Sequence, residues 1–339
     1  MELKRGINLG GFLSQCEYEQ EHYETFIGED DIRTIHDWGF DHVRIPVDYE
    51  VLENEVGEER PDGYRVLKRV IDWCQTYGLN AIIDLHKACG YDFNDAGNAD
   101  KNNLFTDERL QMRYLNLWSK IANAFGAYDC VAFELLNEVV ESQNAARWNR
   151  LIQRTVGVIR IASKTAPIIY GGIMWNSAKT LKLLDKPNDE NIIFTFHFYE
   201  PLIFTHQKAY WVKNMNMTRD VQYPGTKKYY DALSAEIGEQ GLGVIEAESQ
   251  DMGPEFMREM MQEAVSAAKN AGVSLYCGEF GVIDRAPIED TERWFRDVDM
   301  VFREFNIGCA VWNYKNKDFG IADAHYDGIR KELISIWNQ

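Results

Sequence analysis

Short runs of apolar residues recur along the whole chain, and longer segments with a helical spacing of apolar positions separate them. Eight of the runs are nearly continuous in apolar residues, which is typical of parallel strands that are buried on both faces. We expect strands over 6–11, 42–46, 81–86, 131–138, 167–172, 192–199, 274–282 and 309–314.

The segments between these runs have the periodicity of amphipathic helices. One face of the helix predicted over 62–77 carries Tyr64, Leu67, Val70, Ile71 and Cys74. Further helices are predicted over 107–125, 144–161, 254–271 and 288–305. Eight strands that alternate with helices predict an α/β fold, a (β/α)8 TIM barrel formed by residues 1–339 as a single domain.

A doubly wound open sheet is the alternative fold. Its dinucleotide-binding form begins with glycines at a fixed spacing, and the glycine-rich stretch 6–11 lacks that spacing, which favours the barrel. The stretch from about 201 to 253 interrupts the alternation of strands and helices and is aromatic and polar. We expect it to be an inserted subdomain after the sixth strand, at the C-terminal mouth of the barrel.

Composition excludes several classes of protein. Hydrophobic residues make up 45% of the 339 positions and charged residues 27%, which is an ordinary globular balance. The 36 basic and 54 acidic residues give a net charge of −18, which repels phosphate backbones and argues against a nucleic-acid partner. No run of eighteen apolar residues occurs, so no membrane association is expected. The only partner expected is a small or polymeric substrate, and the chain is expected to be a monomer.

The cysteines and histidines do not have the spacing of a metal site. The six cysteines form no Cys-x-x-Cys pair and are expected to be reduced thiols. His86 and His197 lie on different predicted strands, and neither a His-x-His nor a His-Glu-x-x-His sequence is present, so we expect no catalytic metal and no cofactor. The amino terminus has no apolar signal segment, which predicts a cytoplasmic protein, with a trimmed secreted chain as the alternative.

Polar and aromatic side chains occur at the ends of six predicted strands. A barrel of this class has its active site at the carboxyl ends of its strands, where side chains from different strands converge. The candidates at these ends are Arg44, His86, Asn137, Glu138, His197, Tyr199, Glu279 and Trp312. Convergence from six strands favours an active site over a set of unrelated structural residues.

Two of these candidates are carboxylates that could act as a pair. Glu138 and Glu279 follow strands four and seven, which face each other across an eight-stranded ring. Cleavage of a glycosidic bond needs two carboxyl groups that flank it, one protonated and one ionised. Glu134 has the same strand parity as Glu138 but lies deeper, so we expect it to be a structural carboxylate paired with a barrel arginine. Asn137 and Glu138 are adjacent, and both reach the site only if the strand end bulges or turns.

The motifs that carry these residues resemble glycoside hydrolase family 5. The resemblance rests on Phe133-Glu134-Leu135-Leu136-Asn137-Glu138, followed 141 residues later by Gly278-Glu279-Phe280-Gly281. The stretches 6–11, 42–46, 197–199, 204–209 and 311–315 fit as well, and the small clostridial endoglucanase type of that family is the most similar. The resemblance covers nearly the whole chain.

The resemblance implies a role for each candidate. It implies that Glu138 is the general acid/base and Glu279 the nucleophile of a retaining endo-β-1,4-glucanase. The substrate that it implies is a β-glucan oligosaccharide or polysaccharide, soluble or of mixed linkage. Arg44 and Tyr199 are expected to contact Glu279 and to favour its ionised form.

The other candidates are expected to bind the sugar. The resemblance implies that Asn137 binds the sugar 2-hydroxyl, that His86 and His197 line the central subsite, and that Trp312 forms a stacking floor. Lys87 departs from the family pattern, in which many relatives have a second histidine, so one subsite is expected to differ.

Three alternatives remain at this stage. The same carboxylate pair would serve a glucomannanase or β-mannanase, since the motifs do not fix the sugar epimer. A carbohydrate-binding barrel without activity is the second alternative. A barrel lyase or metal-dependent hydrolase is the third.

Overall fold

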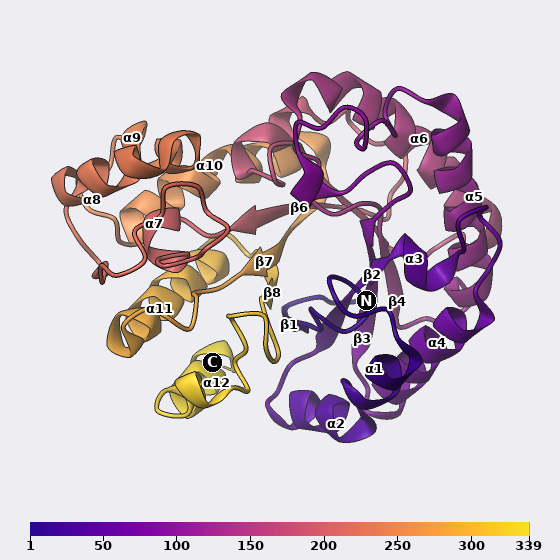
Figure 1. Ribbon diagram of the computed structural model, residues 1–339, viewed down its shortest axis with the longest axis horizontal. Coiled ribbons are helices and arrows are strands. Elements are labelled where there is room, and N and C mark those ends of the chain that lie inside the picture. Colours follow the sequence, from indigo (N-terminus) through magenta and orange to yellow (C-terminus); the bar gives the residue numbers. More distant parts are fainter. Residues whose placement is uncertain (339) are drawn as a thin grey trace.

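The computed structural model describes residues 1–338, and within that range the chain forms a closed barrel of eight parallel strands in sequence order (Figure 1). The predicted (β/α)8 barrel is therefore confirmed. The strands are β1 (Arg5–Asn8), β2 (His42–Asp48), β3 (Asn80–Lys87), β4 (Val131–Glu134), β5 (Ile168–Gly171), β6 (Ile192–Phe198), β7 (Ser274–Phe280) and β8 (Gly308–Val311).

The five predicted helices begin and end within about one residue of their expected limits. They are α4 (Pro61–Thr76), α5 (Glu108–Phe125), α6 (Ala145–Ala162), α10 (Pro254–Ala271) and α11 (Ile288–Glu304). The remaining helices of the barrel are α1 (Gln20–Thr25), α2 (Glu29–Asp37), α3 (Tyr49–Leu52) and α12 (Arg330–Trp337), with the 3-10 turns η1 (Phe93–Asp95), η2 (Ser142–Asn144), η3 (Ala178–Leu183) and η5 (Ala324–Tyr326). Only the short η3 stands between β5 and β6 in place of an α-helix.

Side chains fill the lower part of the barrel. A separate apolar cluster inside the ring comprises Ile82, Ala132, Ile169, Tyr276 and Ala310, each from a different strand. All seven residues of β2 are buried, because side chains of the barrel interior cover one face and helices cover the other. This apolar cluster fills the barrel interior, so polar side chains can meet only at the carboxyl ends of the strands.

Three strands end three or four residues earlier than the apolar runs predicted. β1 ends at Asn8, β4 at Glu134 and β8 at Val311, although the runs continue to 11, 138 and 314. Leu135 and Leu136 remain buried after β4 ends, so burial continues where strand pairing has stopped. The chain turns there, and Glu138 has a left-handed φ of 27°, which gives the turn that Asn137 and Glu138 need to reach one site.

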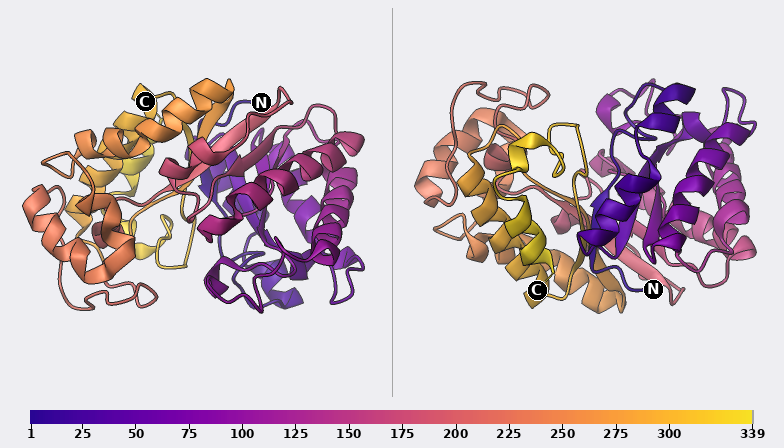
Figure 2. Two further views of the ribbon diagram at one scale, coloured as in Figure 1. Left: turned by 90° about the horizontal axis from the view of Figure 1, so that it is seen from above. Right: turned by 90° about the horizontal axis from the view of Figure 1, so that it is seen from below.

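The stretch between β6 and α10 folds into short helices beside α10 and α11. It contains α7 (Leu202–Thr205), α8 (Lys227–Ser234), the 3-10 helix η4 (Ala235–Gly241) and α9 (Leu242–Ile245), and it lies on the opposite side of the molecule from α5 and α6 (Figures 1 and 2). Its description as an inserted subdomain stays a prediction. No helix within residues 1–338 is long and apolar enough to cross a membrane.

Candidate active site

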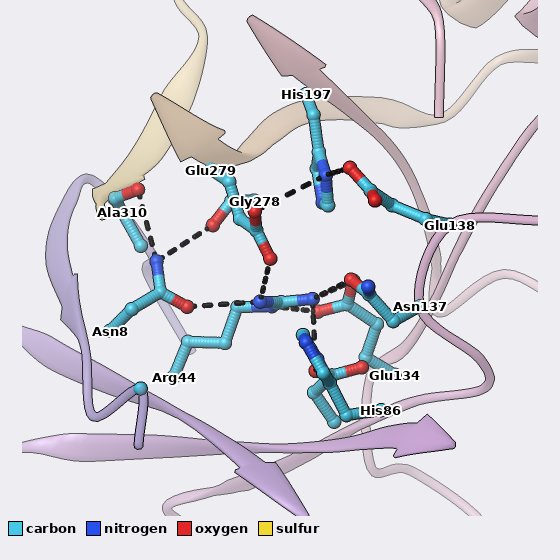
Figure 3. A network of polar contacts seen from close by, with 12 residues as sticks. Asn8, Arg44, His86, Glu134, Asn137, Glu138, His197, Gly278, Glu279 and Ala310 are labelled. Carbon is cyan, nitrogen blue, oxygen red and sulfur yellow. Dashed lines mark hydrogen bonds and ion pairs between the residues drawn. The ribbon is translucent and has the colours of Figure 1, made fainter. Parts of the chain in front are cut away.

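Arg44 of β2 is the centre of the polar network at the mouth of the barrel (Figure 3). Its side chain has no exposed surface. Nη1 donates to Oε1 of Glu279 at 2.8 Å, and Nε and Nη2 donate to the two oxygens of Glu134 at 2.7 and 3.0 Å. Nη2 also lies 3.0 Å from Oδ2 of Asp84. One buried cation therefore stabilises three buried carboxylates, which would be costly to bury without it.

Two asparagines complete the surroundings of Arg44. Asn8 accepts from Nη1 at 2.9 Å, and Asn137 accepts from Nη2 at 2.9 Å. The Nδ2 of Asn8 donates to the carbonyl oxygens of Gly278 and Ala310, at 3.0 and 3.2 Å. These bonds fix the plane of the guanidinium group, and they join β1 to the ends of β7 and β8.

Glu279 lies on β7 with both of its oxygens bonded. Arg44 holds Oε1, and the hydroxyl of Tyr199 donates to Oε2 at 3.0 Å. Nδ1 of His197 lies 3.5 Å from the same Oε2. The contacts of Glu279 with Arg44 and Tyr199 that the family resemblance implied are both present, so each carboxylate oxygen of Glu279 accepts a hydrogen bond.

Glu138 follows β4 and is held differently. Its Oε1 lies 2.8 Å from Nδ1 of His197, and its side chain is 14% exposed. The hydroxyl of Tyr91 donates to the Glu138 carbonyl oxygen at 3.0 Å and accepts from the Val140 N–H at 2.7 Å, so Tyr91 fixes the turn that carries the carboxyl group. No guanidinium or lysine ammonium group forms an ion pair with Glu138 within the described residues.

Burial favours the neutral forms of both Glu138 and His197. It raises the pKa of Glu138 from 4.5 to about 7, against the opposing charges of His86 and Arg44. Burial also lowers the pKa of His197 from 6.5 to about 4, although Glu279 acts in the opposite direction. At neutral pH the ring of His197 is therefore uncharged, and a large fraction of Glu138 keeps its proton.

A second group of side chains lies around His86 of β3. The ring of His86 stacks on Trp312 with centroids 6.0 Å apart and planes 7° apart. Its Nδ1 lies 2.6 Å from Oδ2 of Asp84. Burial lowers the pKa of His86, but the charge and hydrogen bond of Asp84 outweigh it, so the net change in its pKa is upward. Gly10 leaves room for Trp312, because a Cβ there would lie 2.7 Å from the indole ring.

Glu138, His197 and Glu279 could in principle hold a metal ion. Each offers one atom, and the three atoms lie within 4.8 Å of one another. However, Nδ1 of His197 already bonds to Glu138, and Glu279 accepts hydrogen bonds from the Arg44 cation and from Tyr199. Hydrogen bonding thus accounts for the grouping, and a second cation would lie beside the charge of Arg44.

The structure brings together the predicted site residues that carry polar side chains, and it adds others. Glu134 is buried and paired with Arg44, as expected. Lys87 points elsewhere, with Nζ 3.0 Å from Asp92. Sequence reasoning missed the supporting roles of Asp84, Asn8 and Tyr91. For Asp84 a signal existed, because it lies two residues before His86 on the same strand and must share its face.

Comparison with known proteins gives one family for most of the chain. The cellulase family, glycosyl hydrolase family 5, matches residues 5–318. Endoglucanase C of Acetivibrio thermocellus is 38% identical and covers 99% of this chain and 98% of its own length. Cellodextrinase A of Ruminococcus flavefaciens is 37% identical and covers 91% of this chain and 84% of its own length.

Solved structures with the same fold support this result. Cel5A of Thermotoga maritima, solved with mannotriose, superimposes with a TM-score of 0.75 at 25% identity, over 99% of this chain and 97% of its own. Subunit Z of the cellulose synthase of Clostridioides difficile has a TM-score of 0.78 at 24% identity and covers all of both chains. The second match supports the barrel fold alone.

Proposed function

Since the chain belongs to glycoside hydrolase family 5, we propose that it is a retaining endo-β-1,4-glucanase that cleaves internal bonds of soluble or mixed-linkage β-glucans. The observation that carries the proposal is the difference between two neighbouring carboxyl groups. Glu138 has a raised pKa near 7, whereas Glu279 accepts hydrogen bonds from Arg44 and Tyr199. Glycosidases need one carboxyl group that donates a proton and one that is ionised.

The spacing of the two carboxyl groups supports retention of configuration. The facing oxygens of Glu138 and Glu279 lie within 4.8 Å of each other. Retaining enzymes hold the two groups about 5–5.5 Å apart, whereas inverting enzymes need about 6.5–9.5 Å to admit a water molecule. A gap this short leaves no room for water between Glu279 and the anomeric carbon, so direct attack by the carboxylate is the reaction that fits.

The proposed reaction has two steps. Glu138 donates its proton to the glycosidic oxygen while an oxygen of Glu279 attacks the anomeric carbon, which breaks the glycosidic bond and forms a covalent glycosyl-enzyme. Glu138 then takes a proton from water, whose oxygen attacks the anomeric carbon and releases Glu279. The pKa of Glu138 near 7 suits both directions of proton transfer at neutral pH.

The remaining candidates would hold the sugar. Trp312 and His86 form a stacked aromatic pair, and a flat apolar face of this kind can pack against the face of a glucose ring. Asn137 has its carbonyl oxygen bonded to Arg44, which leaves its amide N–H groups as donors for a sugar 2-hydroxyl.

A glucomannanase or β-mannanase is the second candidate function. The observation in its favour is that the Thermotoga maritima neighbour was solved both with mannotriose and with cellobiose. The Ruminococcus relative is named Cellodextrinase A, which adds cellodextrins to the substrates to be tested. The glucanase and the mannanase would use the same carboxyl groups and would differ only in the sugar that they accept.

The test is hydrolysis of barley β-glucan, carboxymethyl cellulose and glucomannan by the wild type and by Glu279→Gln. Viscosity and reducing ends are followed together, and we expect a fast fall in viscosity on the glucans that the substitution abolishes. Glu141→Gln is the matched control. It lies three residues after Glu138, and its carboxylate bonds to the N–H of Gly97 and not to the site.

Two results would contradict the proposal. Activity on glucomannan alone would identify the protein as a glucomannanase or β-mannanase with the same mechanism. Sugar binding without hydrolysis of any of the three polymers would identify a binding barrel. The anomer released first, observed by proton NMR, tests retention separately: a β-anomer is expected, and an α-anomer would refute the mechanism.

A further inference from the structure

Asn176 contacts His197 on the side opposite to the catalytic carboxyl groups. Its side chain is 1% exposed, and its Nδ2 lies 3.4 Å from Nε2 of His197. Its main-chain carbonyl accepts from the His197 N–H at 2.9 Å, so both its backbone and its side chain meet the same residue.

The backbone around Asn176 is strained, which indicates a constrained position. Met174, Trp175 and Asn176 have φ values of 52°, 58° and 52° in succession, a left-handed conformation that L-residues adopt rarely. Two glycines leave room for the contact. A Cβ on Gly171 would overlap the Asn176 amide, and a Cβ on Gly278 would lie 3.3 Å from Nε2 of His197.

The contact determines which ring nitrogen of His197 carries the proton. Burial lowers the pKa of His197 to about 4, so the ring is neutral at neutral pH and has one N–H. The Asn176 amide presents its NH₂ group to Nε2, and an NH₂ group can only donate, so in this orientation Nε2 accepts and the proton lies on Nδ1. Nδ1 is the nitrogen that faces Oε1 of Glu138 at 2.8 Å (Figure 3).

The position of this proton decides which oxygen of Glu138 can be the acid. With the proton on Nδ1, the ring donates to Oε1, and the acidic proton of Glu138 must be on Oε2. Within residues 1–338, Oε2 has no hydrogen bond from the protein, so its proton is free for a leaving group. In the opposite tautomer, with the proton on Nε2, Nδ1 would accept a hydrogen bond from Oε1–H of Glu138. The acidic proton would then be bonded to His197 and would not face the leaving group.

We propose that Asn176 is a positioning residue that fixes the Nδ1–H form of His197 and thereby keeps the acidic proton of Glu138 on its free oxygen. This inference rests on the proposed role of Glu138 as the general acid. Asn176 acts through His197 and has no contact with the reacting atoms of its own.

The test is Asn176→Asp, assayed on two substrates. A carboxylate can only accept, so Nε2 would carry a proton, either in the neutral Nε2–H tautomer or in a cationic ring. In both cases Glu138 loses the acidic proton on its free oxygen, and aspartate tolerates a left-handed φ as asparagine does. Barley β-glucan has a sugar leaving group that needs protonation, whereas 2,4-dinitrophenyl β-cellobioside has a leaving group that needs none. We expect kcat/KM on the glucan to fall by about 10² or more, the contribution typical of general acid catalysis, and kcat/KM on the dinitrophenyl substrate to change by less than about threefold.

A matched control separates this effect from the burial of a new charge. Asn149→Asp makes the same change at a buried asparagine whose amide bonds to the carbonyl of Leu183 and to the N–H of Asp185, away from the site. The ratio of the two kcat/KM values should stay at its wild-type level in this variant. Equal losses on both substrates in Asn176→Asp would mean a structural role alone and would overturn the inference.

A second measurement keeps the inference testable if Asn176→Asp does not fold. Nitrogen-15 NMR of the histidine side chains of the wild type, with the His197 signals assigned by their loss in His197→Gln, reports the protonated nitrogen directly. A proton on Nδ1 is expected, and a proton on Nε2 would overturn the inference. If the wild type hydrolysed neither substrate, the proposed function would be wrong, whereas the NMR result would still decide where the ring proton lies.

Discussion

Replacing Glu138 by glutamine should change the stability of the protein in a way that depends on pH. The folded protein holds the Glu138 carboxyl group in a buried place, which raises its pKa from 4.5 to about 7. Between these two values the unfolded chain releases the proton while the folded chain keeps it. The free energy of unfolding of the wild type must therefore decrease as the pH rises from 4.5 to 7, and then level off.

The size of the effect follows from the difference in pKa between the folded and the unfolded chain. A tenfold change in proton affinity corresponds to about 1.4 kcal/mol of free energy. The wild type should lose about 2.5 kcal/mol of stability through Glu138 between pH 5 and pH 8, since most but not all of the titration falls within that interval. Glutamine does not titrate, so the Glu138→Gln variant should gain about this amount relative to the wild type over the same interval.

The assay is urea unfolding of both proteins at pH 5 and at pH 8, followed by tryptophan fluorescence. Groups that do not contact Glu138 titrate equally in the two proteins, and His197, whose pKa is about 4, stays uncharged over this interval, so the difference between the two proteins reports Glu138. Glu239→Gln removes one negative charge at an exposed position and serves as the control, for which the difference from the wild type should stay the same at both pH values. An equal difference at both pH values for Glu138→Gln would refute the reasoning from burial.

Three further predictions concern the same site. Arg44→Met should lower the free energy of unfolding by about 3–5 kcal/mol, because it leaves buried carboxylates without their cation, and urea unfolding would detect this. The kcat/KM on soluble glucan should fall about tenfold for each pH unit above about 7, because Glu138 must be protonated to act as the acid, and a pH–rate profile tests this. Gly10→Ala should lower kcat/KM about tenfold, since the new Cβ would displace the ring of Trp312, and unchanged kinetics would remove Trp312 from substrate binding.

The barrel was predictable because its strands are buried on both faces. Each strand is a short apolar run that stands out from the helical periodicity around it, so the number of strands and their order could be predicted from the sequence. The residues at which the strands end could not be predicted in this way. Leu135 and Leu136 are as buried as the strand before them, yet they have left the sheet, and hydrophobicity records burial without recording strand pairing.

The site was predictable as a set of residues but not as a network. Strand ends gave the position of Arg44 and of both catalytic candidates, because parallel strands bring their carboxyl ends to one mouth. Nothing along the chain shows that Arg44 contacts three carboxylates, since that depends on how the barrel closes. Asn176 was missed for another reason: its position depends on three successive left-handed residues in a short connection, and no pattern of residue types predicts them.

The difference between the two carboxyl groups that we propose as catalytic follows from how the positive charge is distributed. Arg44 is bonded to Asp84, Glu134 and Glu279, which leaves Glu138 with a neutral imidazole as its nearest partner. A cationic His197 at 2.8 Å would favour the ionised form of Glu138 and remove the acid. Burial, assisted by the charges of Arg44 and His86, keeps His197 uncharged because it lowers the pKa of the ring. Glu138 therefore retains its proton near neutral pH because it is buried and because the Arg44 guanidinium group is bonded to the other three carboxylates.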